Sequence, residues 1–301
     1  MNFLIRPSHK LSHTGRVAQP GQRATVIGAA AMLSLFLAAC GQRASVPVEQ
    51  QPDAGSFESL LTTGVWSDLS HDFSADTLYW PTADGFSHTE DFAGMTDKGY
   101  YYSSYRIGSS EHGGTHLDAP VHFAEDRHST DAIPLNRLIG PGAVINVSAR
   151  TATNADYQVG IEDIRQWERK HGVVPDGAIV LFNTGWHRRW PDAQRYLGTA
   201  ERGEQAVAKL HFPGIDPQLA QWLIDQRSIA AVGIDTASID YGQSTQFMTH
   251  RILFEQNIPG FENVANLDAL PATGALIVAL PMKIRGGSGG PLRIVAWVPK
   301  P

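Results

Sequence analysis

Cysteine is almost absent from the chain: among its 301 residues only Cys40 occurs. A single cysteine leaves no partner for a disulfide within the chain, and it argues against a structural zinc site, a closed cage that often uses several cysteines. A serine nucleophile of the α/β-hydrolase kind is not indicated either, because the one Gly-x-Ser-x-Gly match, residues 286–290, does not lead into an obvious helix. Together these absences disfavour catalysis through a covalent intermediate.

Acidic residues are missing from the first 39 positions, which carry four basic residues. An uncharged, largely apolar run follows from residue 24 to residue 39 and ends in Leu-Ala-Ala-Cys-Gly. A basic start, an apolar core and small residues before a cleavage point are typical of a secretory signal. The run is too short to be a comfortable membrane span. The pattern therefore predicts a signal peptide over residues 1–39.

The pentapeptide around Cys40 resembles the lipobox of bacterial lipoproteins. The resemblance implies a lipoprotein whose lipidated Cys40 attaches it to the membrane of the bacterial cell envelope, on the periplasmic or extracytoplasmic side. An ordinary signal peptide with an incidental cysteine is the alternative, and the true start codon lies downstream of Met1 if the long basic stretch is untranslated. Residues 40–60 are small and polar and contain prolines, which predicts a flexible tether before one domain over residues 61–301.

Positive charge is scarce in the remaining chain. Removal of residues 1–39 takes away four basic residues and no acidic one, so that 262 residues with a formal net charge of −10 remain. A phosphate backbone is bound by clustered basic side chains, and this excess of acid therefore argues against a nucleic-acid partner.

Short apolar runs alternate with amphipathic segments in the second half of the chain. Periodicity predicts helices that start near Gly160 and at Asp216, where Asp is the N-cap and Pro217 is the first helical residue. Strands and helices in alternation indicate an α/β fold, although periodicity leaves the strand order open. The predicted strands span residues 143–147, 178–182, 229–234, 276–280 and 292–298.

The segment from His112 to Phe123 holds three histidines and one aspartate within eleven residues: His112, His116, Asp118 and His122. Gly113, Gly114 and Pro120 oppose a helix, and residues at even spacing share one face of an extended chain. The spacing therefore predicts a metal site on a strand or extended loop. Imidazole and carboxylate ligands together suit zinc, manganese or iron(II).

Further candidates for the chemistry lie outside this segment. Asp235 follows an apolar run, His250 lies in a polar stretch, and Glu262 is a carboxylate in an apolar and amide-rich stretch. Spacing alone leaves His250 and Glu262 open between ligands and solvated surface residues. Most aromatic residues between positions 66 and 105 are expected in the core, with a few lining a pocket. The glycine-rich stretch 286–290 lacks the order of a phosphate loop and predicts a tight connection between strands.

The histidine segment resembles the signature of the cyclase family, which contains bacterial kynurenine formamidases and isatin hydrolases, and matching motifs extend over about residues 65–299. The resemblance implies a swivelling β/β/α domain with a mixed sheet, assembled as a homodimer or homotetramer. It implies one or two divalent metals per chain, zinc or manganese. The residues that it implies as ligands are His112, His116 and Asp118 for one metal, and Asp118, His250 and Glu262 for the second, with His122 as the catalytic acid/base.

The expected activity is therefore metal-dependent hydrolysis of a small-molecule amide by an activated water, as in an arylformamidase. An N-formylkynurenine-like substrate is expected first, with Tyr79, Trp80 and Phe86 as candidates for holding its aryl group. Isatin or another cyclic amide, or a lactone or ester, is the alternative substrate. A metal-containing binding lipoprotein without turnover is the alternative from another class. A lipid anchor is unusual for a member of this family, because enzymes of tryptophan catabolism normally work in the cytoplasm. The stretch 186–214 is also longer than in the small formamidases, and this length could change the shape of the substrate pocket.

Overall fold

A mixed sheet of eight strands forms the centre of the protein in the computed structural model, which describes residues 63–300. The signal peptide, Cys40 and the tether expected over residues 1–60 lie outside the described residues. The α/β class and the mixed sheet expected from the sequence are confirmed. In chain order the strands are β1 (Gly64–Asp68), β4 (His116–Asp118), β5 (Ile139–Asn146), β7 (Ile179–Asn183), β9 (Ala231–Ile234), β10 (Gly260–Glu262), β11 (Leu276–Pro281) and β12 (Gly289–Pro299).

The last strand closes the sheet into a ring. The strand order is β1-β12-β11-β5-β7-β9-β10-β4, and β4 also pairs with the start of β12. Strands β5, β7, β9 and β10 run parallel, whereas the pairings that involve β4, β11 and β12 are antiparallel. Strand β12 is long enough to pair with β1 and β11 along its length and with β4 at its first residues. The strand that carries His116 and Asp118 is therefore held between β10 and β12.

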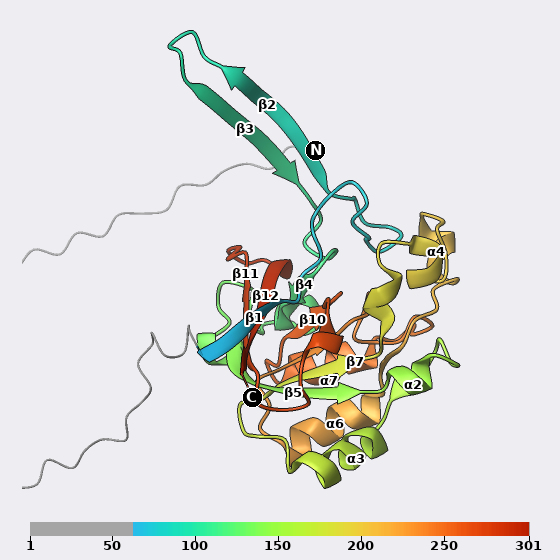
Figure 1. Cartoon of the computed structure of the whole chain (residues 1–301). Helices are drawn as coiled ribbons and strands as arrows, with labels where there is room; N and C mark the ends of the chain where they lie inside the picture. Colours follow the sequence, from blue (N-terminus) through green and yellow to red (C-terminus); the bar gives the residue numbers. More distant parts are fainter. Residues whose placement is uncertain (1–62, 301) are drawn as a thin grey trace, which may run out of the picture. The chain divides into compact units, whose positions relative to one another are not determined.

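Alternate residues of the central strands face two different cores. Val180 and Phe182 of β7 pack with helices on the outside of the sheet, and Ile179 and Leu181 pack with residues of β4, β11 and β12 on the inside. The helices that cover the outer face are α3 (Ile161–His171), α6 (Pro217–Gln226) and α7 (Met248–Glu255) (Figure 1). This alternation has the two-residue period of a strand that is buried on both faces.

The predicted helix start at Asp216 is confirmed. Its side chain accepts a hydrogen bond from the backbone N–H of Gln218, and Pro217 occupies the first helical position. This arrangement satisfies an N–H that the helix leaves without an internal partner. The shorter elements of the described chain are β6 (Gln158–Val159), β8 (Gly214–Ile215), α2 (Ser148–Thr151), α4 (Ala193–Tyr196), α5 (Glu204–Val207) and four 3-10 turns, η1 (Pro120–His122), η2 (Leu135–Arg137), η3 (Trp186–Arg189) and η4 (Leu267–Ala269).

A hairpin of β2 (Ser87–Met95) and β3 (Tyr101–Gly108) stands apart from the sheet (Figure 1). Within the described residues its strands pair only with each other, and nearly every residue on both faces is exposed. The expectation that most aromatics of this region lie in the core is wrong. The aromatic residues concerned, each at least 40% exposed, are Trp66, Phe92, Tyr100, Tyr101, Tyr102 and Tyr105. Among residues 63–300 the chain forms no helix with the length and apolarity needed to cross a membrane.

Candidate metal centre

Strand β4 gives His116 and Asp118 their common direction. The two residues are separated by Leu117, whose side chain points into the inner core, and both are almost fully buried. His116 Nε2 lies 3.1 Å from Asp118 Oδ1. The even-spacing argument therefore holds for these two residues.

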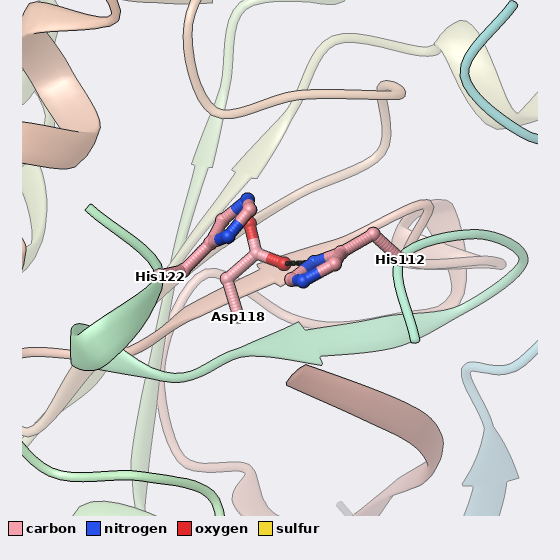
Figure 2. A group of neighbouring side chains, drawn as sticks. All are labelled: His112, Asp118 and His122. Carbon is pink, nitrogen blue, oxygen red and sulfur yellow. Dashed lines mark hydrogen bonds and ion pairs between the residues drawn. The ribbon is translucent and has the colours of Figure 1, made fainter. Parts of the chain in front are cut away.

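His112 reaches the same point from the turn before β4. Its Nδ1 lies 2.6 Å from Asp118 Oδ1 (Figure 2). The intervening Gly113 has φ of +159°, and a Cβ there would lie 2.0 Å from the ring of Tyr79. Only glycine lets the chain pass this close to Tyr79 on its way from His112 to β4.

His122 arrives by a different path from the one that its spacing predicts. The chain leaves the extended conformation after Asp118 and turns through η1, where Pro120 is the first residue. This turn stacks the His122 ring on the His112 ring at a centroid distance of 3.8 Å (Figure 2). The prediction of one shared strand face is therefore wrong for His122, although the residue lies in the cluster.

The second half of the chain supplies His250 and Glu262. Glu262 ends β10 directly opposite His116, and one of its oxygens lies 3.4 Å from His116 Nε2. His250, on α7, places Nε2 at 3.1 Å from Asp118 Oδ2 and at 3.2 Å from Glu262 Oε1. The structure thus brings the other expected ligands and His122, five residues in all, together around Asp118, whose two oxygens face different histidines.

The pKa values of the two carboxylates in this cluster, Asp118 and Glu262, are shifted in opposite directions. Burial and the negative charge of Asp118 raise the pKa of Glu262. Burial opposes ionisation of Asp118 too, but His112 and His116 hold its pKa well below the usual range. Burial would lower the pKa of His116, yet Asp118 and Glu262 raise it to about 9. The two carboxylates therefore favour positive charge at the centre of the cluster, which protonated His116 and His250 supply here and which a bound cation would supply in their place.

The histidines are arranged as metal ligands commonly are. His116 Nδ1 donates to the carbonyl oxygen of Gly114 at 3.0 Å, and His250 Nδ1 donates to Asp240 Oδ2 at 2.6 Å. The Nε2 atom of each ring then faces Asp118 and Glu262, and among residues 63–300 the buried His116 Nε2 has no hydrogen-bond partner. A second nitrogen held by an acceptor is the usual support of a ligating histidine. The donor set thus fits a divalent metal, in the two groups His112–Asp118–His122 and His116–Asp118–Glu262.

His122 differs from the other histidines in its electrostatic surroundings. Burial lowers the pKa of His122 to about 4, and the neighbouring His112 and His250 act in the same direction against the opposing charge of Asp118. Its side chain lines the pocket and is only half-buried, whereas those of His116 and His250 are buried. A neutral imidazole in this position can accept a proton from a group bound beside the cluster.

Two residues outside the expected set support the cluster. Asp240 orients His250, and it also accepts from the backbone N–H of His250 at 3.1 Å. Asn263 donates from Nδ2 to the Gly114 carbonyl that His116 uses. Each residue acts through a contact between segments that the fold brings together, so the spacing of residues in the sequence does not predict either role.

Asp235 lies in another network. It is fully buried and accepts hydrogen bonds from the backbone N–H and hydroxyl of Thr184, from the N–H of Trp186 and from His187. These contacts hold the loop after β7. The interpretation of Asp235 as a functional group at a strand end is therefore not supported by its contacts, which are structural.

A cavity of about 280 Å³ opens onto the histidine cluster. Tyr79 and Trp80 line it as expected, but Phe86 does not, because it packs on Phe73 at a centroid distance of 5.6 Å. Leu197 is the contribution of the stretch 186–214. The other apolar residues of the wall are Leu78, Phe123, Ala237 and Phe247. The pocket thus combines an apolar wall with a polar, titratable floor.

Comparisons with known proteins agree with this geometry. The family model named Cyclase matches residues 67–241. Isatin hydrolase of Roseibium aggregatum is 34% identical over 198 residues, which cover 63% of this chain and 73% of that protein. Kynurenine formamidase of Salinibacter ruber is 30% identical over 236 residues, covering 76% and 95%. The solved structure of isatin hydrolase A from Labrenzia aggregata, bound to benzyl benzoate, superposes with a TM-score of 0.73 at 32% identity, over 81% of this chain and 97% of that one.

Proposed function

Since the chain belongs to the cyclase family, we propose that it is a metal-dependent hydrolase of small-molecule amides. The observation that carries the proposal is the buried cluster of imidazoles and carboxylates at the floor of an apolar pocket. The proposed metal ligands are His112, His116, Asp118, His250 and Glu262. Zinc or manganese, one or two ions per chain, suits this mixture of nitrogen and oxygen donors.

The titratable residues at the floor of the pocket and the aromatic residues of its wall have different roles in the proposed reaction. A divalent metal, when bound, lowers the pKa of a coordinated water and polarises an amide carbonyl. Asp118 and Glu262 hold the negative charge that retains such a cation. His122, beside the pocket, accepts a proton from the attacking water and delivers it to the leaving nitrogen. Tyr79 and Trp80 provide aromatic surface against which a flat aryl group packs and from which water is excluded.

An aryl formamide of the N-formylkynurenine kind is the first substrate, as for the Salinibacter ruber relative. A cyclic aryl amide such as isatin is the second. The likeness to isatin hydrolases in both sequence and structure supports this alternative. Both substrates present an amide carbonyl next to a flat ring, so the pocket accommodates aryl amides as a class. The shape of its apolar wall determines which of the two substrates is hydrolysed faster.

The first experiment measures metals per chain by elemental analysis and assays the same purified sample on N-formylkynurenine and on isatin. We expect bound metal and turnover of one of the two, with activity lost on chelation and regained on addition of zinc or manganese. Bound metal without turnover of either compound, or of aryl esters and lactones, would favour a metal-containing binding protein over an enzyme. A folded sample that binds no metal contradicts the proposal.

A pair of variants assigns the activity to the cluster. His116→Ala removes a buried nitrogen that faces both carboxylates, and it should abolish turnover and reduce the metal content. His171→Ala, at the exposed end of α3, is the matched control and should change neither quantity. Full activity and full metal content of the His116 variant would be incompatible with the assignment.

We further propose that the protein is anchored to the cell envelope through lipidated Cys40, with its enzymatic domain on the extracytoplasmic side. The lipobox-like sequence supports this. Cys40→Ser should release the protein from the membrane fraction and abolish incorporation of radiolabelled palmitate. An unlabelled wild-type protein in the soluble fraction contradicts the anchor and leaves the hydrolase untouched.

Self-association as a dimer or tetramer is also proposed. Its support is the β2–β3 hairpin, because a lone two-stranded hairpin is only marginally stable in water, and Tyr101 and Ile107 are 65% and 61% exposed. Light scattering should report more than one chain per particle for the wild type and a smaller particle for the variant Tyr101→Ser with Ile107→Ser. A monomeric wild type at tens of micromolar would count against it.

A further inference from the structure

The glycine-rich loop between β11 and β12 does more than connect two strands: it binds the carboxylate of Glu111. The backbone N–H of Ser288 donates to Glu111 Oε2 at 2.9 Å, and that of Gly289 donates to the same oxygen at 3.2 Å. The hydroxyl of Ser288 lies 2.7 Å from it. Three donors of the loop therefore converge on the residue that immediately precedes His112.

Ser288 also contacts His112, since its Oγ lies 2.9 Å from His112 Nε2. The direction of this hydrogen bond follows from counting protons. A serine hydroxyl has one hydrogen, and an ionised carboxylate such as Glu111 can only accept. The hydroxyl hydrogen therefore goes to Glu111, and the Ser288 oxygen accepts a hydrogen from His112 Nε2.

In the neutral ring that a metal requires, a proton on Nε2 leaves the Nδ1 atom of His112 with its lone pair. That lone pair faces Asp118 Oδ1 at 2.6 Å, where two acceptors would repel each other without a cation between or beside them. His116 and His250 are oriented the opposite way, since each donates from Nδ1 and directs Nε2 to the carboxylates.

We propose that Ser288 and Glu111 are positioning residues that make Nδ1 the metal-binding atom of His112, whereas His116 and His250 bind through Nε2. This inference rests on the metal centre of the proposed function. The relay runs from His112 Nε2–H to Ser288 Oγ–H to Glu111. Ser288 is not a nucleophile in this arrangement, because its proton is directed to Glu111 and it does not line the pocket.

The glycines of the loop are explained by this contact. A Cβ at position 289 would lie 2.6 Å from His112 Cε1 and 2.7 Å from the carbonyl oxygen of Leu117. Gly289 pairs with Asp118 across the β12–β4 ladder, and the carbonyl of Ser288 accepts from the N–H of Ala119 at 2.8 Å. The pairing of β12 with β4 thus fixes the position of Ser288 relative to His112 and Asp118.

The test reads the protonation of each imidazole directly. The zinc-loaded chain, labelled with ¹⁵N-histidine, is examined by long-range ¹H–¹⁵N correlation, and His112→Gln identifies the signals of His112. We expect a ring with its proton on Nε2 for His112 and rings with their protons on Nδ1 for His116 and His250. A His112 ring that carries its proton on Nδ1 overturns the inference.

Metal affinity provides the second measurement, by competition with a chromophoric chelator. Ser288→Ala and Glu111→Gln should each weaken zinc binding about 10- to 100-fold, as loss of an outer hydrogen-bond partner commonly does. Ser129→Ala removes another serine hydroxyl that donates to a carboxylate, that of Asp131, but this hydroxyl is not bonded to any histidine of the cluster, and its loss should leave affinity unchanged. The thermal midpoints of the metal-free variants report whether the fold is intact.

The outcomes separate this inference from the proposed function. If the wild type binds zinc and the Ser288 and Glu111 variants, folded as judged by their midpoints, bind it equally well, the positioning role is wrong and the metal centre stands. If the wild type binds neither zinc nor manganese, both are wrong.

Discussion

Asp118 is the residue on which the other ligands converge. Its Oδ1 faces His112 and His116, and its Oδ2 faces His250. Asp118→Asn replaces one oxygen by an NH₂ group and removes the charge, so it should reduce metal affinity and turnover by roughly 100-fold or more. Chelator competition and initial rates measure the two effects. Asp225→Asn, exposed on α6, is the matched control, and equal behaviour of the two variants would contradict a central role for Asp118.

His71 contributes a pH dependence that belongs to the fold rather than to the metal centre. Its ring stacks on Trp190 at 4.2 Å, and its buried Nε2 has no hydrogen-bond partner. Burial lowers the pKa of His71 to about 4, and the charge of His187 lowers it further against the attraction of Asp235. Between pH 6.5 and pH 4 the unfolded chain therefore binds a proton that the folded chain does not, and stability falls as the pH falls.

The variant His71→Phe keeps a stacked ring and removes this titration. The free energy of unfolding of the metal-free wild type should fall relative to that of the variant as the pH is lowered from 6.5 to 4, by at most about 1.4 kcal/mol per pH unit. Urea denaturation at several pH values in the presence of a chelator measures the difference. Parallel curves for the two proteins over this range would show that His71 does not titrate in this way.

Sequence identified the residues of the cluster better than it identified their geometry. His116 and Asp118 follow from the period of a strand, but His122 reaches the site through a 3-10 turn that a local pattern of spacing does not reveal. Ser288 and Asp240 could not be found in this way. Each acts by touching a ligand histidine, Ser288 from 176 positions away and Asp240 from ten. Such contacts depend on the strand order, which periodicity leaves open.

At the scale of elements, the buried strands were the most predictable part of the chain. The apolar runs around β5, β7, β9, β11 and β12 coincide with strands to within a few residues. The aromatic run that contains Tyr101 and Tyr105 was wrongly assigned to the core, since both side chains are exposed. Hydrophobic composition does not tell which other segment, if any, packs against a given apolar side chain. Among residues 63–300 no layer packs against either face of the paired strands β2 and β3.

Strand β7 should be the element most sensitive to truncation of its side chains. Leu181 is fully buried in the inner core between β5 and β9. Leu181→Ala should lower the free energy of unfolding by about 2–5 kcal/mol, through lost burial and a cavity that a closed sheet cannot easily fill. Chemical denaturation measures this. Val173→Ala, at a side chain that is 68% exposed, should change stability by no more than about 0.5 kcal/mol. A similar loss for both variants would be inconsistent with a tightly packed ring.

At the scale of the whole molecule, the proposed metal centre lies where strands far apart in the sequence meet. Strands β4, β10 and β12 come together there, with Asp118 on β4 and Glu262 on β10. If the metal binds the folded chain and not the unfolded one, as the proposed function requires, zinc or manganese should raise the thermal midpoint in proportion to the logarithm of its free concentration above the dissociation constant. Calorimetry at increasing metal concentration tests this expectation. A midpoint that does not change on chelation or metal addition would mean that the cluster is stable without a cation.

The place of β12 in the order of synthesis has a consequence for the site. The strand that closes the ring and places Ser288 beside His112 is made after the other seven strands of the sheet. A nascent chain therefore has its histidines long before the cluster can form, and metal capture by the folded cluster must follow synthesis of β12. If residues 1–39 direct export as their sequence predicts, the chain crosses the membrane before this step, and the ion that it acquires is the one supplied by the compartment in which it folds.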